Sequence, residues 1–145
     1  MLIFIIQILL SIAGLTISLY FALVYYGRMR ADPFFIPQFC RLEEKSCKTI
    51  LGTPQARLFR VPNFVPGMLY YFIVLVVGIL GVLGTPLNNT FFWGLIGASC
   101  LTVFVGIYLS YSLLAIIRIP CPLCFTGHGI NIILCGMFLY QKFSV

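Results

Sequence analysis

The sequence predicts an all-α integral membrane protein, a four-helix bundle with one extramembrane loop between its first two helices. Of its 145 residues, 61% are hydrophobic and only 8% are charged, whereas a soluble domain carries about 25% charged residues. Four stretches reach the roughly 20 apolar residues that a helix needs to cross a bilayer, and none alternates as a β-barrel strand would. They span residues 2–26, 64–84, 91–117 and 119–140 of what we expect to be a single membrane domain, residues 1–145.

The first stretch is expected to be a retained helix rather than a signal peptide. No basic residue precedes it, it is longer than the apolar part of a signal peptide, and no small-residue cleavage pattern is present. The loop after it, residues 27–63, holds ten of the chain's twelve charged residues, all between Arg28 and Arg60. The formal charge of +6 therefore marks one basic loop and not a nucleic-acid-binding domain. Four prolines exclude a single continuous helix there: Pro33, Pro37, Pro54 and Pro62.

Short breaks separate the remaining helices. A turn with one Pro and two Asn, residues 85–90, joins the second helix to the third, and Arg118 and Pro120 break the third from the fourth. Two membrane crossings lie between the loop and the start of the fourth helix, so both are on the same side of the membrane. This parity brings the cysteines of the loop to the face that carries the cysteines of the fourth helix.

Cys121 and Cys124 form a Cys-x-x-Cys motif where the fourth helix begins. Unpaired backbone amides and the helix dipole favour a thiolate there, and the thiolate is the attacking species in disulfide exchange. Pro122 suits a first helical turn, because its missing N–H would have no partner in that turn anyway. By itself the motif is also compatible with a static disulfide or a four-cysteine zinc site.

A second pair, Cys40 and Cys47 in the loop, favours redox use, because two dithiols within reach can pass a disulfide between them. Six residues separate these two cysteines, whereas a zinc site more often repeats the short knuckle spacing. The sequence leaves the two members of each pair interchangeable. Cys100 and Cys135 lie inside predicted helices, where cysteine commonly behaves as a small apolar residue, and we assign them no role.

Two polar residues follow the motif on the fourth helix. His128 and Asn131 come four and seven residues after Cys124, which places all three along one helix face. Polar groups at this depth usually face the bundle interior or a cavity, and they often mark function. For Asn131 we expect only a hydrogen bond to a neighbouring helix.

Taken in order, these features resemble the vitamin K epoxide reductase family, integral-membrane enzymes that couple a quinone to disulfide formation. The loop pair ends at Cys47, and Thr53 follows six residues later, where the family usually has serine. Residues 58–62 resemble the segment that leads into the second helix of bacterial members, although Arg60 replaces a frequent glycine. The likeness covers residues 39–131 and all four predicted helices.

The resemblance extends to the quinone pocket of animal members. Asn63, Gly67 and Tyr71 have the spacing of a residue set in that pocket, and His128 occupies a position that is tyrosine in those proteins. The fourth-helix Cys-x-x-Cys completes the match.

What the resemblance implies is a quinone-dependent thiol oxidoreductase that generates disulfides and passes them to a thioredoxin-like partner, which we expect to be a separate chain. The implied cofactor is a quinone of the ubiquinone or menaquinone type, taken from the membrane pool. Electrons would pass from the loop pair through the helix pair to the quinone. The implied catalytic residues are Cys40, Cys47, Cys121, Cys124 and Thr53. The implied quinone-binding residues are Asn63, Tyr71 and His128.

Two other functions are compatible with the paired cysteines. A soft-metal ion carrier would use thiolates at a membrane face to hold copper, zinc or mercury ions. Against it stand the ordered loop motif, the single histidine of the chain and the lack of acidic residues in the predicted helices. The third possible function is that of a structural membrane subunit whose cysteines form stabilising disulfides.

The basic loop and the resemblance predict opposite orientations in the cell membrane, where we expect this multi-pass protein. The loop carries seven Lys and Arg, against Lys142 alone on the opposite face, which by the positive-inside rule puts the loop in the cytoplasm. Most members of the family have their active face on the outer or lumenal side, where disulfides persist. From the sequence, both orientations stay open.

Overall fold

Four long helices make up most of the computed structural model, which describes residues 1–28, 53–54, 57–58, 60–118 and 121–144. Each helix is long and apolar enough to cross a membrane, as predicted. They are α1 (Leu2–Tyr25), α4 (Phe64–Val82), α5 (Asn89–Tyr111), which continues as the π-helix η2 (Ser112–Ile117), and α6 (Pro122–Phe143). The all-α membrane fold is therefore confirmed.

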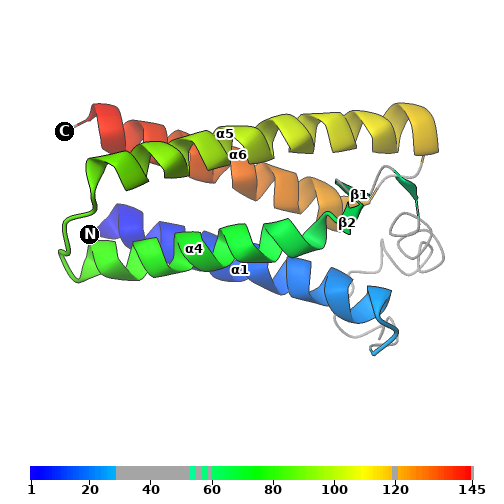
Figure 1. Ribbon diagram of the computed structural model, residues 1–145, viewed down its shortest axis with the longest axis horizontal. Helices are drawn as coiled ribbons and strands as arrows, with labels where there is room; N and C mark the ends of the chain where they lie inside the picture. The colour runs from blue at the N-terminus through cyan, green and yellow to red at the C-terminus, as the bar shows by residue number, and fades with distance from the viewer. Residues whose placement is uncertain (29–52, 55–56, 59, 119–120, 145) are drawn as a thin grey trace.

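The helices pack as two pairs. α1 lies along α4, α5 lies along α6, and α1 also contacts α6 (Figure 1). Successive helices run in opposite directions, so both termini lie at one end of the bundle and the start of α6 lies at the other (Figure 1). That second end, named the loop end below, also holds a short antiparallel hairpin of β1 (Arg57–Leu58) and β2 (Val61–Pro62), whose strands lead into α4. The parity expected from the sequence is observed for these residues.

Small and polar residues form the contact between α1 and α4. Five of the six buried residues of α1 recur every three or four positions, which puts them on one face of the helix: Gln7, Ser11, Gly14, Ser18 and Ala22. Gln7 is 0% exposed, and its Nε2 donates a hydrogen bond to the carbonyl of Val74 on α4 (3.1 Å). Small residues allow this close approach of backbones, and interhelical hydrogen bonds add to it, as in other membrane bundles.

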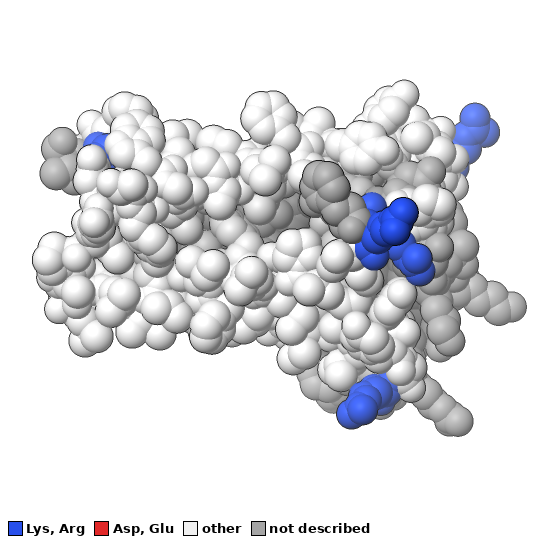
Figure 2. Space-filling model, viewed as in Figure 1, with Lys and Arg blue, Asp and Glu red and all other residues white. Residues whose placement is uncertain are grey.

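The sides of the bundle are apolar, and its described charged side chains lie at its two ends. Figure 2 shows Lys and Arg at the two ends of the molecule and none along the length of this face. Many large apolar side chains on the outer faces of the helices are exposed, among them Leu9, Leu69 and Phe104. The described cations of the loop end are Arg28, Arg57, Arg60 and Arg118, and Lys142 lies at the opposite end. This distribution fits a chain surrounded by lipid along its sides.

The helix bounds differ from the predicted ones by a few residues, for local reasons. α6 begins at Pro122 rather than at residue 119, because Cys121 precedes a proline and is extended (φ −116°, ψ 103°). α5 begins at Asn89, where the side chain of Asn88 caps it by accepting a hydrogen bond from the Thr90 backbone N–H (2.9 Å). At the other end of this span, Arg118 stops η2 in a left-handed conformation (φ 57°).

Candidate functional site

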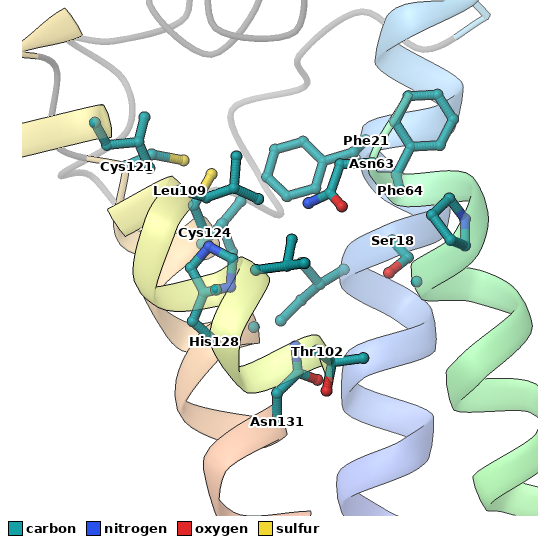
Figure 3. A pocket seen from close by; sticks show the side chains of 18 of the residues that line it. Ser18, Phe21, Asn63, Phe64, Thr102, Leu109, Cys121, Cys124, His128 and Asn131 are labelled. Atoms are coloured by element: carbon teal, nitrogen blue, oxygen red, sulfur yellow. The ribbon is translucent and has the colours of Figure 1, made fainter. Parts of the chain in front are cut away.

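A cavity of about 220 Å³ opens at the loop end of the bundle, between all four helices. Its walls are mostly apolar, with side chains such as Phe21, Phe64 and Leu109 (Figure 3). The space is far larger than the roughly 10–15 Å³ that one water needs. A mostly apolar cavity with a few polar groups is the usual form of a small-molecule site.

The Cys-x-x-Cys motif forms one end of this cavity. Cys121 is the N-cap of α6, and Pro122 lies in the first helical turn, as the sequence predicted. Both cysteines line the cavity; Cys121 is 0% exposed and Cys124 is half-buried (Figure 3). Both cysteines therefore lie at the start of α6, at the positive end of its helix dipole.

Two polar side chains line the cavity and make no hydrogen bond to other residues that the structure describes. Asn63 precedes α4 but makes no capping hydrogen bond to it, and its side chain lies at the cavity (Figure 3). His128 lies one turn below Cys124 on α6 and makes no hydrogen bond to any other residue that the structure describes. Both groups are therefore available to a ligand.

Gly106 on α5 makes room for the His128 ring. A Cβ added at Gly106 would lie 2.9 Å from Nδ1 of His128, closer than real side chains approach. The absence of a side chain at this position thus helps to set where the imidazole lies.

Tyr71 ties α4 to α6 below the cysteines. Its hydroxyl lies 2.7 Å from Oδ1 of Asn131 and 3.2 Å from the carbonyl of Gly127. The ring packs against Gly14 of α1, where any added Cβ would overlap it. Asn131 makes the interhelical hydrogen bond that we expected, and it also lines the cavity, so it belongs to the site.

The structure brings together the predicted site residues that it describes. These are Thr53, Asn63, Tyr71, Cys121, Cys124 and His128, all of which line the cavity. Cys40 and Cys47 lie outside the described residues. The roles expected for all eight residues stay predictions.

Sequence reasoning missed several residues of the cavity wall, among them Ser18, Thr102 and Ser112. Ser18 had a signal, since it continues the stripe of small and polar residues on α1. Thr102 and Ser112 lie in a long apolar stretch with no comparable pattern. Outside the cavity, the sulfurs of Cys100 and Cys135 lie 3.6 Å apart, a contact between α5 and α6 that the sequence did not predict.

Comparison with known proteins places this architecture in a family. The model of the vitamin K epoxide reductase family matches residues 5–139, almost the whole chain. No curated protein matches the chain significantly. The chain therefore belongs to the vitamin K epoxide reductase family, whose members are membrane redox enzymes, generally linked to a quinone.

Proposed function

We propose that this protein is a quinone-dependent thiol oxidoreductase that generates disulfides and passes them to a thioredoxin-like protein. One observation carries the proposal: Cys121 and Cys124 line the same apolar cavity as Asn63 and His128, whose side chains make no hydrogen bond to any residue that the structure describes. A dithiol beside a ring-sized apolar space with two polar contacts is the arrangement that such a reaction requires.

These residues fit a quinone. Its flat apolar ring suits the walls, and its two carbonyl oxygens are hydrogen-bond acceptors. The amide N–H₂ of Asn63 and a ring N–H of His128 can each donate to such an oxygen. Asn63 lies just before α4 and His128 lies on α6, so the two side chains reach the cavity from different walls. Tyr71 acts mainly as a positioning residue, because its hydroxyl already contacts Asn131.

The chemistry at α6 is a two-electron exchange. When Cys121 and Cys124 form a disulfide, they release the two electrons and two protons that reduce one quinone to its quinol. Cys124 lies one helical turn nearer His128 than Cys121 does, so we assign it as the cysteine that faces the quinone. Cys121, the N-cap, is then the sulfur that exchanges with the loop.

The loop pair would connect the site to a protein substrate. A reduced thioredoxin-like protein attacks the Cys40–Cys47 disulfide at Cys40 and leaves as a disulfide, which releases both loop thiols. The Cys47 thiolate then attacks Cys121 in the Cys121–Cys124 disulfide, which frees Cys124 and forms a Cys47–Cys121 mixed disulfide. Cys40 attacks Cys47 in turn, so the loop disulfide is restored and Cys121 and Cys124 are left as two thiols. Thr53 lines the cavity, and its hydroxyl is suited to stabilise a thiolate or to hold the loop. The assignment of order within each pair follows the family resemblance together with this geometry.

The test is oxidation of a reduced thioredoxin-like protein by the purified protein in detergent, with and without a soluble quinone analogue. We expect thiol loss and quinone reduction in equal amounts, and turnover only when the quinone is present, because the dithiols alone hold too few electrons. A stoichiometric metal found by elemental analysis, with no quinone-dependent oxidation, would instead favour the soft-metal carrier.

A further inference from the structure

The hydroxyl of Ser112 is buried in the cavity wall and has no hydrogen-bond partner among the residues that the structure describes. Its side chain is 1% exposed, and Oγ is the one fully buried side-chain oxygen or nitrogen without a hydrogen bond in the part of the chain that the structure describes. Ser112 lines the cavity. Such an orphaned polar group is rare in native proteins and calls for an explanation.

Two other buried serines of the bundle avoid this cost by bonding to their own helix. Oγ of Ser11 donates to the carbonyl of Gln7 (2.7 Å), and Oγ of Ser99 donates to that of Leu95 (2.8 Å). Ser112 makes no such bond. It stands where α5 changes into the π-helix η2, and π-helical turns occur frequently at functional sites.

From this geometry we infer that Ser112 donates a hydrogen bond to a carbonyl oxygen of the bound quinone. The inference rests on the proposed function and adds a third polar contact from a third helical segment, besides those of Asn63 and His128. A quinone carbonyl oxygen has two lone pairs and can therefore accept from Ser112 in addition to another donor. Ser112 would then act as an affinity and specificity determinant of the site.

If Ser112 has this role, removing its hydroxyl should not destabilise the ligand-free protein but should weaken quinone binding. Without a ligand, removal of the hydroxyl removes an unsatisfied buried group, so Ser112→Ala should not lower the melting temperature. With a ligand, the same change leaves a quinone oxygen without its donor, so binding should weaken. A serine that only supports the fold would show a lower melting temperature and unchanged binding.

The sharpest comparison is between Ser112→Thr and Ser112→Val, which have nearly the same shape and differ in the hydroxyl. Ser110→Ala is the matched control, because Ser110 lies on the same helix and outside the cavity lining. Each full-length variant is titrated in detergent with a short-chain quinone analogue. Binding is measured by calorimetry, and turnover is measured with dithiothreitol as the reductant.

We expect the quinone Kd and KM of Ser112→Val to exceed those of Ser112→Thr by about three- to tenfold, the effect of one hydrogen bond. kcat should change little, and Ser110→Ala should match the wild type. Equal quinone Kd values for the Thr and Val variants, in a series whose wild type binds and reduces quinone, would overturn the inference and leave the proposed function intact. A wild type that binds no quinone would contradict both.

Discussion

At the scale of single residues, the position of His128 depends on a neighbour that has no side chain. Gly106 faces the imidazole across the α5–α6 contact, and a methyl group there would come within 2.9 Å of Nδ1. Gly97, two to three turns earlier on the same helix, has open space around it. The two glycines therefore form a matched pair in which one can affect the site and the other cannot.

We predict that Gly106→Ala raises the KM for quinone, by roughly tenfold if it abolishes the His128 hydrogen bond. The cause would be displacement of the imidazole, not loss of a catalytic group, so kcat should fall less than affinity. Steady-state kinetics with dithiothreitol and a quinone series measures both. Gly97→Ala is the control and should behave as the wild type; an equal loss in both variants would refute the steric explanation.

Some site residues could be predicted because the sequence around them forms a recognisable motif, whereas others could not. Thr53 and Asn63 were identified through the family resemblance, and His128 was first singled out because it shares a helix face with Cys124. All three line the cavity. Gly106 and Ser112 could not be identified in this way. A glycine or a serine inside a long apolar stretch has no distinctive spacing, and its importance lies in a contact with another helix or in a missing hydrogen bond.

At the scale of elements, length and apolarity were enough to predict four helices, but not their ends. The side chain of the N-cap Asn88 sets the start of α5 through one hydrogen bond. The proline that follows the N-cap Cys121 sets the start of α6. The π-helix η2 was not predicted, because the apolar residues of this segment satisfy an α-helical pattern equally well. The start of α6 is the boundary that matters most for the proposed function, since it places Cys121 and Cys124 at the positive end of the helix dipole.

Because the cysteines form a loop pair and a helix pair, we expect variants of the two pairs to differ in the reductants that they can use. Changing Cys121 or Cys124 to Ala should abolish turnover with every reductant, because these thiols line the quinone cavity. Changing Cys40 or Cys47 to Ala should abolish turnover with a thioredoxin-like protein and preserve it with dithiothreitol. A small thiol can reach the helix pair directly, whereas a folded protein needs the loop as a shuttle.

Quinone reduction, followed for the four variants with both reductants, checks this split. Equal losses in all four variants with dithiothreitol as well as with the protein substrate would mean that the loop pair is structural.

At the scale of the whole molecule, the antiparallel bundle is what joins distant parts of the chain at one site. Thr53 and Asn63 from the segment before α4 meet Cys121 from the start of α6, because two crossings return the chain to the loop end (Figure 1). The number of membrane crossings in the sequence predicted that the loop and the start of the fourth helix lie on the same side of the membrane. The same end carries most of the described cations. Under the proposed function, the orientation of this basic end would decide which compartment supplies the thiol substrate.

The central claim is that a disulfide passes between the loop and α6, and such a relay must go through a mixed disulfide. If Cys47 attacks Cys121, then Cys40→Ser and Cys124→Ser should each trap that bond, because each removes the thiol that resolves it in one direction. Both variants should also carry Cys100→Ala and Cys135→Ala, since these sulfurs lie 3.6 Å apart and could pair during sample handling.

Peptide mapping of these variants without reductant is the most direct measurement. We predict a Cys47–Cys121 crosslink in most molecules, which requires the two α-carbons to come within roughly 7 Å of each other. A Cys40–Cys121 crosslink would reverse the order of the shuttle, and the absence of any crosslink between loop and α6 would contradict the relay.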